Sequence, residues 1–426
     1  MLWNTVLMAV SWPVGVATSV VIGRWLGPAG KGDYTLAMLI SPALFAVLNL
    51  GLPGSISYYL AGAKAPENAL VKTFLALAGL LGAAALAVAI ALHQTGWCLY
   101  VFGVPKFTPA MWIGAFGLPF YFAGTFLQFV SLAQGRQVWF AALPAAGQLG
   151  VGGAIGVLVW SGRLTSATAA GVMVASYVVT AATLVSQQRR LAWWRAPWTG
   201  LALWKSLVRY TALTYLGNTV QFLVQRLDVL LLSALSGLRE VGLYSVAYGT
   251  AELLLLLPQR FSNLYLARIA ASHPMSKAEE VRLLSSLVFL MTLVGAAALA
   301  VLAPFGVRLL YGTAFAGSVR PLWFLLPGIC AAATASIQAA YLAGLGGVKT
   351  TAQINCAGLA LNAFLNLILI PRYGISGAAV AASLTYAAQA ALLSRTVGRL
   401  TQTRPLAMLT SASPALLSAV LKSAFR

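Results

Sequence analysis

The chain has 426 residues, of which 60% are hydrophobic and only 8% are charged, and its mean hydropathy is +0.86. A soluble fold has to cover itself with polar side chains, so this composition excludes a soluble globular protein and indicates a multi-pass membrane protein. The net charge of +20 would indicate nucleic acid in a soluble chain, but here the basic residues lie in short loops between apolar runs, and we expect no nucleic-acid partner.

Twelve apolar runs follow one another along the chain. A helix of about 20 residues crosses a hydrocarbon core of about 30 Å, so we expect an all-α membrane protein with about twelve transmembrane helices. The expected ranges are 2–23, 34–60, 69–92, 110–133, 138–161, 166–187, 207–235, 241–264, 283–305, 320–344, 350–370 and 377–398. The first run has neither a basic leader nor a small-residue cleavage site, so we expect it to be retained rather than cleaved as a signal peptide.

The loops between these runs carry unequal numbers of basic residues. With the N-terminus placed in the cytoplasm, 17 of the 27 Lys and Arg residues lie on cytoplasmic segments and eight on outer segments, while Arg226 and Arg260 lie inside spans. This positive-inside bias predicts that both termini face the cytoplasm.

The central loop divides the expected helices six and six. We therefore expect an N-terminal six-helix bundle at 1–188, a basic and Trp-rich cytoplasmic linker at 189–206, a C-terminal six-helix bundle at 207–400 and a cytoplasmic amphipathic tail at 401–426. Four tryptophans accompany the basic residues of the linker, and we interpret them as anchors at the membrane interface rather than as a nucleic-acid surface: Trp193, Trp194, Trp198 and Trp204.

One motif recurs after 210 residues. Gly32-Asp33-Tyr34-Thr35-Leu36-Ala37 matches Gly242-Leu243-Tyr244-Ser245-Val246-Ala247, and each copy stands where the chain enters the second helix of its half. Leu26-Gly27-Pro28 precedes the first copy and Leu235-Ser236-Gly237 precedes the second. Six helices separate the copies, which predicts a pseudo-two-fold axis near the membrane normal, as in transporters that rock two bundles about a shared cavity. Chance similarity between apolar segments is the alternative.

Ionisable residues inside expected spans are costly to bury, which makes them candidates for function. Arg226 and Asp228 lie two residues apart on one helix, so they do not share a helix face and cannot simply neutralise each other. Arg226 and Glu252 lie at similar depths on adjacent spans, roughly 15 Å from the outer ends, and we expect them to pair. Asp228 has no evident partner, so it is the candidate site for a coupling proton or sodium ion, with a structural contact as the alternative.

Arginine suits phosphate because its planar guanidinium offers a fork of donors that stays charged. Arg24, Arg226 and Arg260 are therefore candidates to bind a diphosphate in a cavity, although Arg24 and Arg260 are equally placed to extend towards an interface. Four amides in the expected spans are candidates for hydrogen bonds to sugar hydroxyls or, alternatively, to neighbouring helices: Asn218, Gln221, Asn362 and Asn366.

The sequence carries no pattern of a catalytic or metal site. Cys98, Cys330 and Cys356 are widely spaced, and His93 and His273 fall in expected loops. Walker, HExxH and GxSxG motifs are absent, and the loops are too short for a catalytic domain. We expect no catalysis, metal or cofactor beyond a coupling ion.

Three groups of motifs resemble one family of membrane proteins. They are Arg24-Trp25-Leu26-Gly27-Pro28 with residues 32–37 and Gly51-Leu52-Pro53, Arg226-Leu227-Asp228 with residues 242–247, and Leu361-Asn362 with residues 374–379. In these motifs, and over nearly its whole length, the chain is similar to polysaccharide flippases of the multidrug/oligosaccharidyl-lipid/polysaccharide exporter superfamily. It departs from their pattern by lacking a short basic leader, and its twelve expected spans differ from the fourteen of lipid II flippases.

The resemblance implies a V-shaped pair of six-helix bundles, as in multidrug and toxin extrusion (MATE) transporters. It also implies the movement of a lipid-linked oligosaccharide, typically on undecaprenyl diphosphate, across the bacterial cytoplasmic membrane by alternating access. Implied partners are membrane lipids and polysaccharide-assembly proteins such as those of O-antigen synthesis, and coupling to H⁺ or Na⁺ is common among relatives. Two alternatives stay open: a cation-coupled multidrug antiporter, which the acid-poor spans disfavour, and a membrane polysaccharide ligase or polymerase, which the short outer loops disfavour.

Overall fold

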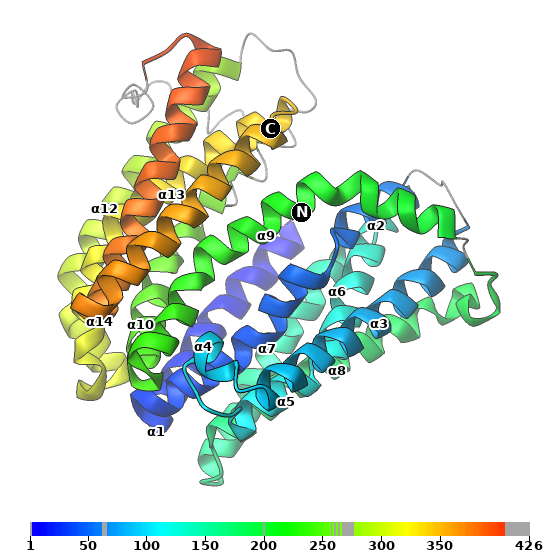
Figure 1. Cartoon of the computed structure of the whole chain (residues 1–426), viewed down its shortest axis with the longest axis horizontal. Coiled ribbons are helices and arrows are strands. Elements are labelled where there is room, and N and C mark those ends of the chain that lie inside the picture. The colour runs from blue at the N-terminus through cyan, green and yellow to red at the C-terminus, as the bar shows by residue number, and fades with distance from the viewer. Residues whose placement is uncertain are drawn as a thin grey trace. The chain divides into compact units, whose positions relative to one another are not determined.

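The computed structural model describes residues 2–61, 66–198, 201–256, 258–259, 261–262, 265 and 277–404. Within these ranges every regular element is a helix (Figure 1). A helix satisfies its own backbone donors and acceptors, which hydrocarbon cannot do. The α-helices are α1 (Leu2–Leu48), α2 (Leu52–Ala61), α3 (Glu67–Gln94), α4 (Cys98–Phe102), α5 (Pro109–Phe116), α6 (Leu118–Ala133), α7 (Gln137–Trp160), α8 (Ser166–Gln188), α9 (Leu201–Ser236), α10 (Leu238–Glu252), α12 (Lys277–Tyr311), α13 (Val319–Gly344) and α14 (Val348–Thr401). The 3-10 helices are η1 (Arg189–Leu191), η2 (Trp193–Arg195), η3 (Leu253–Leu255) and η5 (Thr313–Ser318).

The helices of the structure do not correspond one to one with the twelve expected spans, and the number twelve stays a prediction. Among the described residues, eight helices are long and apolar enough to cross a membrane, and the bent pair α5 and α6 makes a ninth. The physical reason is that α1 and α14 each run through two expected spans, with a single non-helical residue at the junction, Gly27 (φ 67°) or Gly374 (φ 57°). In addition, α10 has only 15 residues.

Two compact units make up the chain. One comprises Met1–Phe222 with Ser236–Gly242, and the other comprises Leu223–Leu235 with Leu243–Arg426. The boundaries between the units fall within α9 and α10. The expected division into six-helix bundles at 1–188 and 207–400, joined by the linker 189–206, stays a prediction. Residues 405–426 of the expected tail lie outside the described ranges.

Asp33 joins three helices of the first unit. Its nearly buried carboxylate, on α1, accepts a 2.6 Å hydrogen bond from Thr108 Oγ1 and a 2.5 Å hydrogen bond from Ser166 Oγ. Thr108 is the N-cap of α5 and Ser166 is the first residue of α8. The neighbouring cation, Lys31, donates to Ser19 Oγ at 2.8 Å. Both ionisable groups therefore have partners within the fold.

The Trp-rich segment after α8 is attached to α3 through Lys72. The ammonium group of Lys72 donates to the carbonyl of Ala196 at 2.8 Å and lies 4.7 Å from the ring centre of Trp198. Trp194 and Trp198 keep 49% and 65% of their surface exposed. The interfacial anchoring of these tryptophans that the sequence indicates stays a prediction.

The second unit is built on α13, which packs against α12 and α14. Its polar contacts join helices that are distant in the sequence. Ser318 Oγ donates to the carbonyl of Leu243 at 2.8 Å, and Gln338 Nε2 donates to Ser394 Oγ at 2.9 Å. These buried hydrogen bonds fix α10 and α14 to η5 and α13.

Backbone geometry supports the repeat of about 210 residues. Glycines with positive φ recur at separations of 209 to 212 residues, in the pairs Gly27 and Gly237, Gly103 and Gly312, Gly135 and Gly346, and Gly162 and Gly374. The first pair aligns Gly27 with Gly237, one residue away from the alignment with Ser236 that the sequence predicted. Glycine adopts positive φ without steric cost, so the two glycines mark the equivalent positions.

The repeated motif makes a reciprocal contact inside the first unit. A Cβ atom added to Gly32 would lie 1.8 Å from the carbonyl oxygen of Leu238, and one added to Gly242 would lie 1.8 Å from that of Pro28. Each glycine thus touches the residue four positions before the other. Such reciprocity is the signature of a local two-fold relationship, and it requires glycine at both positions.

Candidate functional site

The candidate site lies in the second unit, on the hairpin formed by α9 and α10. Gly237 (φ 88°) separates the two helices, and this short connection reverses the chain. Side chains that face each other across the hairpin can therefore meet although they are 16 to 26 residues apart.

Three side chains of α10 share one face of that helix. Tyr244, Tyr248 and Glu252 follow one another at intervals of four residues, which places them in a row along the helix. The rings of Tyr244 and Tyr248 are 6.0 Å apart between centres, and both side chains are buried. The row meets Arg226 and Asp228 of α9.

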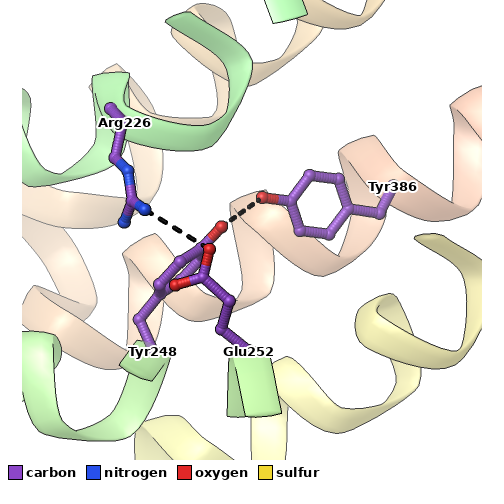
Figure 2. Close-up of polar contacts among 4 residues, drawn as sticks. All are labelled: Arg226, Tyr248, Glu252 and Tyr386. Atoms are coloured by element: carbon purple, nitrogen blue, oxygen red, sulfur yellow. Dashed lines mark hydrogen bonds and ion pairs between the residues drawn. The ribbon is translucent and has the colours of Figure 1, made fainter. Parts of the chain in front are cut away.

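Arg226 contacts the last two members of this row, Tyr248 and Glu252. Its Nη2 atom donates to Glu252 Oε1 at 3.3 Å, and the guanidinium carbon lies 5.2 Å from the ring centre of Tyr248 (Figure 2). The ion pair expected from the equal depths of Arg226 and Glu252 is therefore present. Both side chains remain about one third exposed, at 31% and 32%, so the pair is accessible from outside the packed helices.

Asp228 is bound by the first member of the row, Tyr244. Its side chain is 1% exposed, and it accepts hydrogen bonds from the hydroxyl of Tyr244 and from the backbone N–H of Val229, the latter at 2.8 Å. The sequence suggested no partner for Asp228, and the structure supplies two donors. Arg226 and Asp228 thus bind different partners, as their spacing on the helix predicted.

A third helix completes the cluster. Tyr386 of α14 places its hydroxyl 3.3 Å from that of Tyr248, as Figure 2 shows. Both phenols are buried, at 4% exposure each. Because a ring held at both its face and its hydroxyl has little freedom, Tyr248 fixes the position of the guanidinium above it.

The other two candidate arginines lie elsewhere. Arg24 is exposed on α1, in the first unit, beside Trp25, which is 51% exposed. Arg260 lies outside the described residues. A diphosphate site shared by Arg24, Arg226 and Arg260 therefore stays a prediction.

The four candidate amides have different surroundings. Asn218 is exposed and Gln221 half-buried, both on α9. Asn362 and Asn366 are fully buried on α14, where Asn366 Nδ2 donates to Asn362 Oδ1 at 2.9 Å and Asn362 Nδ2 donates to Thr385 Oγ1 at 3.5 Å. In this conformation the two buried amides join the halves of α14, and the role in sugar binding stays a prediction.

Sequence reasoning missed the tyrosines of the cluster. Tyr244 stood out only as part of the repeated motif, and Tyr386 was not singled out. The spacing of Tyr244, Tyr248 and Glu252 at four-residue intervals was the available signal, since it places three polar groups on one face of an apolar helix. Nothing in the sequence paired Tyr386 with them, because 138 residues separate it from Tyr248.

The arrangement can bind an anion without rebuilding the fold. A guanidinium carries five N–H donors, and among the described residues Arg226 gives one hydrogen bond, to Glu252. The remaining donors and the exposed third of the side chain are free to receive oxygens of a charged ligand. Two phosphate oxygens would match the fork of donors.

Comparison with known proteins gives a family and a fold. The sequence model of the family described as "Polysaccharide biosynthesis protein" matches residues 1–268. A search of curated proteins gives no match.

Several solved structures share the fold at low identity. The lipid II flippase MurJ in an inward closed conformation aligns at 13% identity with a TM-score of 0.76, over 96% of this chain and 89% of that one. An inward-facing multidrug resistance MATE family transporter aligns at 14% identity with a TM-score of 0.65, over 96% of this chain and 100% of that one. A transporter of the same superfamily from Pyrococcus furiosus, described as having a binding pocket of reverse polarity, aligns at 13% identity with a TM-score of 0.64, over 96% of this chain and 94% of that one.

Proposed function

Because the chain belongs to the polysaccharide biosynthesis protein family and is a multi-pass membrane protein, we propose that it moves a lipid-linked oligosaccharide across the membrane. The carrier is undecaprenyl diphosphate or a similar polyprenyl diphosphate, and the membrane is the bacterial cytoplasmic membrane. The product feeds the assembly of a cell-surface polysaccharide such as O-antigen. Membrane lipids and polysaccharide-assembly proteins are the proposed partners, both termini face the cytoplasm, and no bond is made or broken in the substrate.

One observation carries the proposal: the accessible guanidinium of Arg226 at the end of a fixed polar row. Glu252 and Tyr248 hold the group at 3.3 Å and 5.2 Å, while a third of the side chain stays exposed. A diphosphate is the part of the carrier that is hardest to move through hydrocarbon, because its charge is strongly hydrated. A permanent cation inside the transporter offsets that cost.

The pair also offers a way to couple transport to protons. Glu252 competes with an arriving phosphate for the same guanidinium. Protonation of Glu252 removes this competition, so proton uptake and diphosphate binding favour each other. We assign the coupling to Glu252 rather than to Asp228, because Asp228 is 1% exposed and already accepts two hydrogen bonds.

The remaining sequence predictions fit the same scheme. Two six-helix bundles related by a pseudo-two-fold axis would expose the arginine to each side in turn by alternating access, while the polyprenyl tail stays in lipid. Arg24 and Arg260 would add contacts to the diphosphate in conformations other than this one. The accessible amides Asn218 and Gln221 would add contacts to sugar.

Reconstitution in lipid vesicles tests the function. A fluorescent polyprenyl-diphosphate oligosaccharide is placed in both leaflets, and a membrane-impermeant quencher reports the fraction that reaches the outer leaflet. We expect quenching beyond one half of the fluorescence only in vesicles that contain the protein, and recovery of the lipid chemically unchanged. A new glycosidic product would establish a ligase or polymerase instead. Accumulation of ethidium without movement of the lipid would establish a multidrug antiporter.

A further inference from the structure

The first unit contains a pocket that has several polar side chains in its lining. It has a volume of about 320 Å³ and lies between α6, α7 and α8. Its polar lining includes Thr125 and Gln128 on α6, Gln148 on α7, and Ser176, Tyr177 and Thr180 on α8. We call this the three-helix pocket.

Six polar side chains of the three-helix pocket have no hydrogen-bond partner among the residues that the structure describes. Polar groups inside a membrane protein are costly unless hydrogen-bonded, so water or a ligand must satisfy them.

A second cavity in the same unit shows the contrast. It also measures about 320 Å³, and Asn49, Tyr215 and Thr219 are among its lining residues. Those three side chains donate to backbone carbonyls near the end of α1, including Ala46 at 2.8 Å from Thr219. The last carbonyls of a helix need such donors. The polar side chains of that cavity therefore satisfy the carbonyls at a helix end, whereas those of the three-helix pocket do not serve this purpose.

The chemistry of the lining selects the class of ligand. None of the residues that line the pocket is charged, so it offers no counter-ion to a phosphate or to an amphipathic cation. Gln128 and Gln148 each present both a donor and an acceptor, as a sugar hydroxyl does. The rings of Tyr121 and Tyr177, 5.1 Å apart between centres, add apolar faces. Its volume lies at the small end of the ~300–1,000 Å³ found for ligand pockets.

The location suits a transport substrate. Gln148 lies near the middle of α7, Thr125 near the middle of α6 and Ser176 near the middle of α8. The pocket is therefore about halfway through the membrane, the depth at which transporters of this general type hold their substrates. Partial exposure of Phe120, at 42%, shows that the lining can be reached from outside the packed helices.

We propose that the three-helix pocket binds one uncharged sugar unit of the lipid-linked oligosaccharide. This inference rests on the proposed function. It separates recognition of the sugar, in the first unit, from recognition of the diphosphate by Arg226, in the second. The pocket would discriminate against acidic sugars, because a carboxylate there would lose its hydration without gaining a cation.

Vesicle transport with two lipids tests the proposal. One lipid carries a neutral oligosaccharide on polyprenyl diphosphate, and the other is the bare polyprenyl diphosphate. For Gln148→Leu we expect the half-saturating concentration of the first lipid to rise about tenfold, from loss of hydrogen bonds, with movement of the second unchanged. Gln94→Leu is the matched control, because Gln94 is exposed at the end of α3. Folding is checked by gel filtration and thermal unfolding in detergent.

The outcomes separate this inference from the function it rests on. If Gln148→Leu matches Gln94→Leu with both lipids, or slows both lipids equally, the pocket does not bind sugar. If the wild type moves neither lipid, the proposed function fails. A direct measurement of sugar binding then tests whether the three-helix pocket binds a sugar. Saturation-transfer NMR with methyl glucoside should give a signal with wild type that Gln148→Leu weakens severalfold. Equal signals from the two proteins would overturn the proposal.

Discussion

Arg226 and Glu252, on the two helices of the α9–α10 hairpin, hold each other at 3.3 Å while each leaves about a third of its side chain exposed. An ion pair with that exposure contributes little to folding, about 1 kcal/mol or less. A ligand that uses the arginine gives a better reason for two charged side chains at this place in a membrane protein.

Exchanging the two charges tests the pair itself. Arg226→Glu and Glu252→Arg should each stop transport of the lipid-linked oligosaccharide, because each places two like charges together. The double variant should recover a substantial part of the rate, since it restores one guanidinium and one carboxylate at the same place. Initial rates in vesicles measure this, and absence of any rescue would show that the two residues act independently.

Neutralising Glu252 alone tests the coupling. Glu252→Gln keeps Arg226 charged but removes the competing carboxylate, so binding of the diphosphate should persist or strengthen. Transport should then lose its dependence on a proton gradient imposed across the vesicle membrane. A Glu252→Gln protein that responds to the gradient as the wild type does would exclude Glu252 as the coupling group.

Tyr244 should matter for stability. Tyr244→Phe removes the hydroxyl that donates to buried Asp228, and a lost hydrogen bond to a charged group costs ~1.5–3 kcal/mol. Thermal unfolding in detergent should show a clear decrease for this variant and none for Tyr100→Phe, because Tyr100 is 74% exposed. Equal unfolding temperatures would mean that Asp228 does not depend on Tyr244.

Two glycines of α10 give a matched pair of variants. Gly242→Ala places a methyl group 1.8 Å from the carbonyl oxygen of Pro28, so the helices must shift, at a cost of ~1–3 kcal/mol or more. Gly249→Ala meets nothing within 4 Å and should be neutral or slightly stabilising, by up to ~1 kcal/mol. If both proteins unfold at the wild-type temperature, the close crossing of Gly32 and Gly242 is not formed in the membrane protein.

The sequence predicted the helical class, the positions of most helices and the Arg226–Glu252 pair. Long apolar runs identify membrane helices because hydrocarbon leaves the backbone few alternatives, and equal depth on adjacent helices is enough to pair two opposite charges. The breaks at Gly27 and Gly374 were not predicted as interruptions within single elements, because one glycine barely changes the hydropathy of a span.

The contact between Tyr248 and Tyr386 and the three-helix pocket could not be predicted, for a different reason. Tyr386 meets Tyr248 across 138 residues of sequence, and Gln128 and Gln148 acquire a shared cavity only when α6 and α7 pack. Such relationships depend on which helix faces meet in three dimensions. A polar residue without an evident partner in the sequence can therefore acquire one when the helices pack.

The most direct measurement concerns Arg226 and the diphosphate. Vesicle transport should be compared for wild type, Arg226→Gln and Arg372→Gln, an exposed arginine of the same unit that serves as control. The substrates are the oligosaccharide on polyprenyl diphosphate and the same oligosaccharide on an uncharged polyprenyl carrier. We expect Arg226→Gln to slow transport of the diphosphate lipid at least tenfold and to leave transport of the uncharged lipid unaffected. Arg372→Gln should change neither rate. Equal rates for Arg226→Gln and Arg372→Gln with the diphosphate lipid would show that Arg226 does not bind the diphosphate.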